Sequence, residues 1–111
     1  MNRLSFVLPF CLLASPALAD LTYVDFSSTA GLNLVGSTTQ VGNRLQLTSN
    51  GINESGSAWG ATRQDVTSAF STEFTVRMTG NGEGMAFVIQ RDAADALGLG
   101  GESLGYGGLS N

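Results

Sequence analysis

Polar and apolar residues alternate most regularly along residues 69–78. One set of alternate positions holds Phe70, Thr72, Phe74, Val76 and Met78, and the other holds Ser71, Glu73, Thr75 and Arg77. Because successive side chains of a β-strand point to opposite faces, this pattern predicts a half-buried antiparallel strand.

A second strand is predicted at residues 85–89, where Met, Ala, Phe, Val and Ile follow one another after a glycine-rich turn at 79–84. A strand that is apolar on both faces is typical of the middle of a fold, where both faces are covered. Shorter strands are expected at residues 23–26, 32–35 and 44–48. Residues 49–57 carry the glycine, serine and asparagine of a long hairpin connection.

Helical signals are weak. Residues 92–98 could form one helical turn, capped by Asp92 and ended by Gly98, and a glycine-rich loop follows Gly98. Short strands with turn residues between them, and no long helical pattern, favour an all-β sandwich.

The N-terminus has the pattern of a secretory signal peptide over residues 1–19. Arg3 supplies its positive charge, residues 4–13 form an apolar run, and Ala17 and Ala19 fit a cleavage site before Asp20. The apolar run is too short to cross a bilayer, and no second long run follows. We therefore expect a secreted or periplasmic protein with no membrane span, consisting of one domain over residues 20–111.

Composition excludes several function classes. Residues 20–111 carry 4 Arg, no Lys and no His against 9 carboxylates, a net charge of −5 that disfavours a nucleic-acid partner. Gly101, Ser103 and Gly105 match the spacing of a nucleophile elbow, but the chain has no histidine to act as the base. We expect no enzymatic activity.

Glu83 is the most interesting polar residue, because it lies between Gly82 and Gly84 at the start of the most apolar predicted strand. A carboxylate in this position could accept hydrogen bonds from two neighbouring sugar hydroxyls. The alternative is a solvated turn glutamate. A glycosidase would need a second carboxylate across the scissile bond, and no pair of acidic residues alternates along a strand to provide it.

Several blocks, in this order, resemble the N-terminal half of an L-type (legume-type) lectin domain in its bacterial form. They lie at residues 25–26, 45–47, 57–59, 70–76, 80–90, 97–98 and 104–111, and the block at 80–90 reads Gly-Asn-Gly-Glu-Gly-Met-Ala-Phe-Val-Ile-Gln. The resemblance implies a concanavalin-like jelly-roll sandwich, incomplete in this chain, that binds carbohydrate without hydrolysing it.

The resemblance also implies site residues. An acidic residue before a Gly-hydrophobic-Ala-Phe sequence accepts hydrogen bonds from sugar hydroxyls in the family, and Glu83 occupies that position, where the family usually has Asp. A backbone N–H of a glycine-rich loop makes a second contact. Counting back from Leu104 places this contact at Glu102, and Gly101 is the nearest residue that keeps a glycine's close approach.

The family also uses calcium and a transition metal, whose ligands lie beyond the position of Asn111. We therefore expect no metal cofactor in this chain, about half of the family's binding site, and a marginal, aggregation-prone fragment. Two functions remain open. One is a secreted carbohydrate-binding module, and the other is a non-binding structural or adhesive β-module of an exported surface protein.

Overall fold

The computed structural model describes residues 21–110, and the predicted signal peptide with its cleavage site lies outside them. The described chain is β-rich. It contains β1 (Leu32–Gly36), β2 (Thr39–Val41), β3 (Arg44–Gln46), β4 (Gly56–Gly60) and one 3-10 turn, η2 (Gly101–Ser103). Within this part of the chain, no helix has the length and apolar character needed to cross a bilayer.

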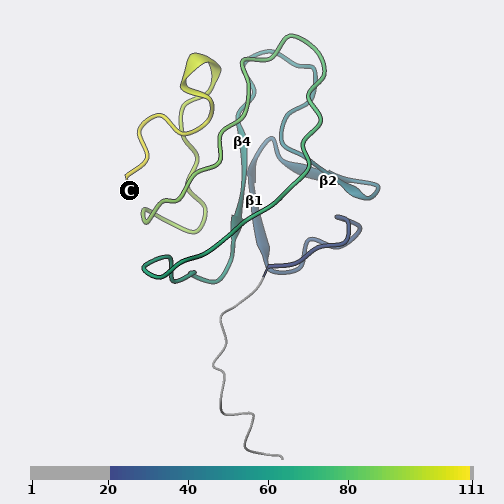
Figure 1. The fold of residues 1–111 in the computed structure, drawn as a ribbon. Coiled ribbons are helices and arrows are strands. Elements are labelled where there is room, and N and C mark those ends of the chain that lie inside the picture. The colour runs from purple at the N-terminus through teal and green to yellow at the C-terminus, as the bar shows by residue number, and fades with distance from the viewer. Residues whose placement is uncertain (1–20, 111) are drawn as a thin grey trace, which may run out of the picture.

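The centre of the fold is an antiparallel ribbon of β1 and β4, in which Leu32 lies opposite Gly60 and Gly36 opposite Gly56. The strand predicted at 32–35 is thus confirmed. Its partner β4 was not predicted, because its glycine and serine content suggested a connection between strands. In Figure 1 the yellow C-terminal segment lies on one side of this ribbon and the β2–β3 hairpin on the other.

The β2–β3 hairpin holds the start of the described chain. The Gln40 side-chain amide donates to the carbonyl oxygens of Phe26 (2.8 Å) and Ser27 (2.6 Å), and the Phe26 N–H donates to the Asn43 carbonyl (3.0 Å). Residues 24–27 form bends beside the hairpin and residues 23–26 form no strand, so the strand predicted there is wrong. The strand predicted at 44–48 is confirmed over its first three residues, as β3.

The two strands predicted at 69–78 and 85–89 are absent as strands. Within residues 21–110, no backbone–backbone hydrogen bond involves any residue from 62 to 90. The two segments nevertheless approach each other, since the rings of Phe74 and Phe87 stack with centroids 6.0 Å apart. Alternation of side chains selects a face, but a strand also needs a hydrogen-bonding neighbour, and neither segment has one in this part of the chain.

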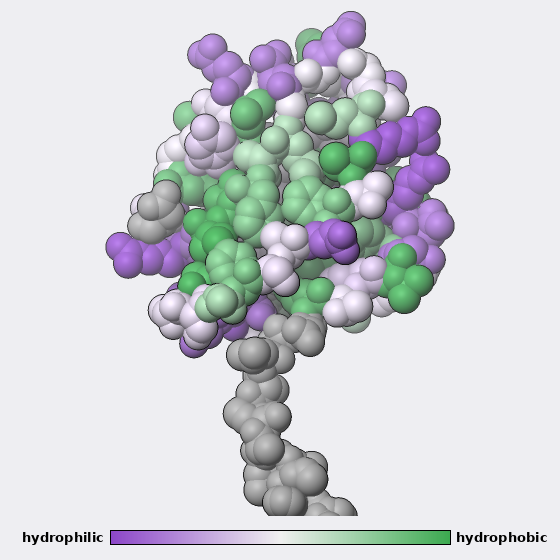
Figure 2. All heavy atoms as spheres, in the orientation of Figure 1, coloured by the Kyte–Doolittle hydropathy of each residue, from purple (hydrophilic) through white to green (hydrophobic). Residues whose placement is uncertain are grey.

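The interior is open. Among the described residues no hydrophobic side chain is buried, and Phe87 and Ile89, expected at the middle of the fold, are 55% and 44% exposed. Residues of β1, β3 and β4 and residues 61–91 line one large hollow that is open to solvent. Figure 2 shows apolar side chains gathered on the face of the molecule, with hydrophilic ones around them.

Candidate functional site

The glycine-rich segment closes on itself as a compact loop beside the central ribbon. Leu99 and Gly107 form a β-bridge, in which the Leu99 N–H donates to the Gly107 carbonyl over 3.0 Å. The Gly105 N–H donates back to the Leu99 carbonyl over 2.9 Å. These bonds bring the ends of the loop together, and η2 lies at its tip.

Side chains from one face of β4 and the residue before it hold the base of this loop. The hydroxyl of Ser55 donates to the Gly98 carbonyl (3.1 Å) and that of Ser57 to the Ala96 carbonyl (3.0 Å). Trp59 Nε1–H donates to the same Ala96 oxygen (2.7 Å). The three donors recur at every second residue, which is the spacing of side chains on one face of a strand. Ser55 and Ser57 lie in the stretch that was expected to be a hairpin connection, so this arrangement was not predicted.

The segment that enters the loop is organised by Gln90. Its side-chain oxygen accepts from the N–H groups of Asp92 (2.6 Å) and Ala93 (3.2 Å). The helical turn predicted at 92–98 is wrong, because only a hydrogen-bonded turn forms there, and Asp92 does not cap it. The Asp92 carboxylate instead accepts from the N–H of Ser110 over 2.7 Å, and so ties the two ends of this region together.

Gly84, the residue that follows Glu83, contacts the glycine-rich loop. Gly84 has a φ of +138°, and a Cβ atom placed on it would lie 3.3 Å from Leu104 Cδ2. The backbone that follows Glu83 therefore packs against the loop at the Leu104-Gly105 pair. The Glu83 side chain itself is exposed. The backbone at Gly84, next to Glu83, and the glycine-rich loop thus lie side by side.

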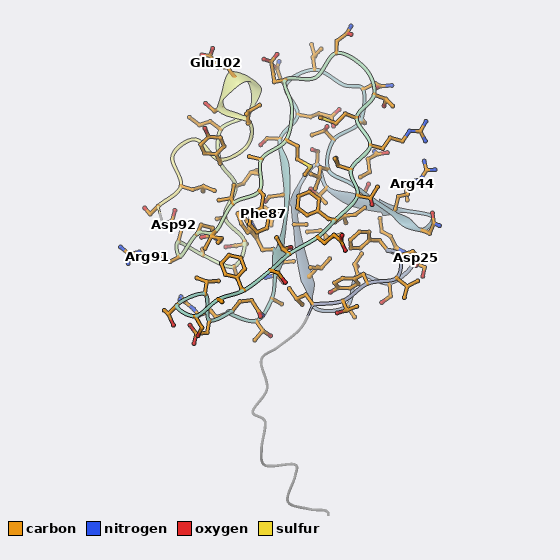
Figure 3. All side chains as sticks on the ribbon, viewed as in Figure 1. Asp25, Arg44, Phe87, Arg91, Asp92 and Glu102 are labelled. Carbon is orange, nitrogen blue, oxygen red and sulfur yellow. The ribbon has the colours of Figure 1, made fainter. Side chains whose placement is uncertain are left out.

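Gly101 and Glu102 lie at the outer end of the loop. Gly101 is exposed and has a φ of +62°, with open space where a Cβ would be. Its carbonyl accepts from the Leu104 N–H (2.8 Å), and neither its own N–H nor that of Glu102 donates to a backbone carbonyl of residues 21–110. Figure 3 shows the Glu102 side chain at the tip of the loop, pointing away from Phe87.

A hollow of about 450 Å³ lies where the loop meets the segment after Glu83. It is lined by Ala86, Phe87, Val88, Ile89, Leu104 and Tyr106. Tyr106 is 48% exposed there. Tyr106 was not among the predicted site residues; an aromatic residue between glycines in a loop was the signal that could have singled it out.

The carboxylates of the described residues are not clustered as metal ligands. Across residues 21–110 no group of three or more His, Cys, Asp or Glu side chains is placed to hold a metal ion. Calcium needs six to eight oxygen ligands, several of them carboxylates.

The carboxylates with displaced pKa values lie outside the candidate site. The hydroxyl and N–H of Ser49 lower the pKa of Glu54, those of Ser27 lower the pKa of Asp25, and those of Thr67 lower the pKa of Asp65. In each case, hydrogen bonds from nearby residues favour the charged form of an exposed carboxylate. These three groups stabilise local turns.

Comparison of the chain with models of known protein families, with curated proteins and with solved structures gave no match.

Proposed function

We propose that this protein is an exported carbohydrate-binding module of the L-type lectin kind, built on a jelly-roll sandwich. The observation that carries the proposal is the packing of Gly84 against Leu104, with 3.3 Å between the Cβ position and the Leu104 side chain. This packing sets the exposed Glu83 beside the glycine-rich loop. Those are the two elements from which the resemblance draws its sugar contacts.

The chemistry of the three groups is complementary to a saccharide ring. The Glu83 carboxylate can accept a hydrogen bond from a sugar hydroxyl, and charge-assisted bonds of this kind are short and strong. The Gly101 N–H can donate to a ring hydroxyl, because no side chain blocks its approach. The exposed ring of Tyr106 offers an apolar surface with a polar tip, suited to the apolar face of a sugar.

Glu102 has a peripheral role in this proposal. Its side chain points outward from the loop tip, away from Phe87, which lines the hollow (Figure 3). Its backbone N–H remains a second possible donor, because a backbone group does not depend on the side chain attached to it. We therefore assign the primary loop contact to Gly101 and a contact at the rim to Glu102.

A non-binding structural or adhesive β-module is the second candidate. It is favoured by the exposed apolar side chains of the unpaired segments, among them Phe70, Phe74 and Met78, which are 52%, 52% and 68% exposed. Large exposed apolar surfaces are typical of protein–protein contacts. In this case the lectin scaffold would bind another protein, and Glu83 and the loop would bind no sugar.

A glycan array with the purified chain, run with calcium and again with a chelator, tests the proposal. Retention of a defined set of glycans supports carbohydrate binding, and its loss with the chelator would mean that calcium takes part. Isothermal titration of a retained glycan should then show no binding by the Glu83→Ala variant. Asp95→Ala is the control, since it removes an exposed carboxylate that is not part of the proposed site. No glycan retention, or equal affinity of the Glu83→Ala variant, would refute the proposed site.

A further inference from the structure

Residues 62–90 have an unused capacity for β-pairing. Their backbone makes no backbone–backbone hydrogen bond within the described residues, although 70–78 carry the most regular strand pattern of the chain. Unpaired N–H and C=O groups along an extended segment are a template for pairing with another chain. The same segment exposes Phe70, Phe74, Val76 and Met78 on alternate positions, each by 47% or more.

The charges of this segment are self-complementary. In an antiparallel pair of two identical strands, residue numbers that lie opposite each other have a constant sum. If Thr75 lies opposite Thr75 of the second copy, Glu73 lies opposite Arg77, and this pair occurs twice. Both side chains are exposed and available for such a contact.

The same register also matches the apolar face. With Thr75 on the two-fold axis, Phe74 lies opposite Val76 and Thr72 opposite Met78, so apolar positions face apolar or neutral positions throughout. A shift of one residue would place Phe74 opposite Thr75, against the alternation of faces. A register centred on Phe74 keeps the faces but puts Glu73 opposite Thr75 and loses both charge pairs.

We propose that two copies of this chain pair through residues 71–79 as antiparallel strands centred on Thr75. Cross-strand neighbours in such a pair lie close enough for their charges to interact directly. The partner is a second copy of the same chain, because the segment complements itself in charge and in apolar pattern. This interface is independent of the glycine-rich loop and does not rest on carbohydrate binding.

Charge reversal in the full chain tests the register. Glu73→Arg places two arginines opposite each other in each pair, and Arg77→Glu places two glutamates there. We expect each single variant to weaken dimerisation by at least about tenfold in sedimentation velocity, because two attractive pairs become two repulsive ones. The double variant, Glu73→Arg with Arg77→Glu, should dimerise like the original chain.

Mixing the two single variants gives a sharper result. In a mixed dimer, the arginines of one chain at positions 73 and 77 face the glutamates of the other, so the mixture should form heterodimers although neither variant dimerises alone. A chain that remains monomeric at the highest concentration it tolerates would overturn the proposal. So would a dimer that survives both single reversals.

Disulfide cross-linking supplies a test that does not depend on dimer strength. In a Cys11→Ser background, which removes the natural cysteine, Thr75→Cys should give an oxidised dimer, because the two thiols would meet at the axis. Ser71→Cys is the matched control on the same face, since in this register residue 71 lies opposite 79 and far from its own copy. Equal cross-linking of both variants, or none at Thr75→Cys, would exclude this register.

Discussion

Trp59 Nε1–H donates to the carbonyl oxygen of Ala96 over 2.7 Å, and this bond joins β4 to the segment that leads into the glycine-rich loop. The same oxygen accepts from the Ser57 hydroxyl over 3.0 Å. One carbonyl thus receives two donors from one face of one strand. The position of the loop relative to the central ribbon depends on this junction.

Replacing Trp59 with Phe keeps an aromatic ring and removes the indole donor. We expect a loss of about 1 kcal/mol in the free energy of unfolding, the usual net value of one such hydrogen bond. Urea unfolding followed by far-UV circular dichroism measures it. Ser57→Ala leaves the stronger donor in place and should cost less. A larger effect for Ser57→Ala than for Trp59→Phe would show that the indole bond is not the main attachment.

Gly98 is expected to tolerate no side chain. A Cβ atom there would lie 2.5 Å from the Gly105 carbonyl oxygen and 2.7 Å from Tyr106 Cα, both of them backbone atoms that cannot move away alone. Gly98→Ala should therefore destabilise the fold by about 1–3 kcal/mol, as overpacked sites do. Faster hydrogen exchange of the Leu99 and Gly105 amides would locate the damage.

Gly82→Ala is the control for this substitution. A Cβ at Gly82 meets nothing within 4 Å, and its backbone does not have a positive φ. Its effect on the free energy of unfolding should stay within about 0.5 kcal/mol. If Gly98→Ala were as mild as Gly82→Ala, the close approach of the loop to Gly98 would be wrong.

The turn at residues 49–54 should loosen in acid. The Ser49 hydroxyl and N–H donate to the Glu54 carboxylate and lower the pKa of Glu54 below its usual value. Because the folded pKa is the lower one, the stabilisation is present above the unfolded pKa and is lost as the pH falls through the folded pKa. A titration of the Ser49 amide by NMR should have its midpoint below the usual glutamate value.

Glu54→Gln provides the comparison, since it keeps the shape of the side chain and removes the titrating group. The acid transition of the Ser49 amide should disappear in this variant. A midpoint at or above the usual glutamate value in the original chain would mean that the two hydrogen bonds do not form in solution.

Shortening the proposed sugar ligand should strengthen binding. The resembled family usually has Asp where this chain has Glu83, and a carboxylate displaced by one methylene loses the geometry for two simultaneous hydrogen bonds. For any glycan retained by the original chain, Glu83→Asp should raise the affinity, by up to about tenfold, measured by isothermal titration. A lower affinity would mean that the loop is placed for the longer side chain.

Local sequence pattern predicted part of the fold correctly. The strands expected at 32–35 and at 44–48 correspond to β1 and the start of β3, where each strand has a hydrogen-bonded partner. The sequence pattern missed β4, because the glycine and serine content of residues 55–57 is also that of a turn, and only the pairing with β1 distinguishes the two. The pattern was clearest at 69–78, yet these residues form no strand. The spacing of residues indicates which side chains share a face, but it does not indicate which other segment will lie alongside and form hydrogen bonds.

For the candidate site, too, the sequence predicted the local features and not the contacts between distant residues. The sequence placed Glu83 before an apolar segment and Gly101 in a flexible loop, both of which are local properties. The contact between Gly84 and Leu104 joins residues 20 positions apart, and the attachment of Ala96 to Trp59 joins residues 37 positions apart. Such contacts depend on the path of the chain in space, which the spacing of residues along one segment does not determine.

The unpaired backbone of residues 62–90 also determines where a protease would cut first. Trypsin cleaves after arginine and needs a flexible stretch of backbone in its cleft. Arg63 and Arg77 lie in the unpaired segment, whereas Arg44 belongs to the β2–β3 ladder. Limited digestion should release fragments ending at Arg63 and Arg77 well before any ending at Arg44, and self-association through residues 71–79 should shield Arg77 while leaving Arg63 open to attack.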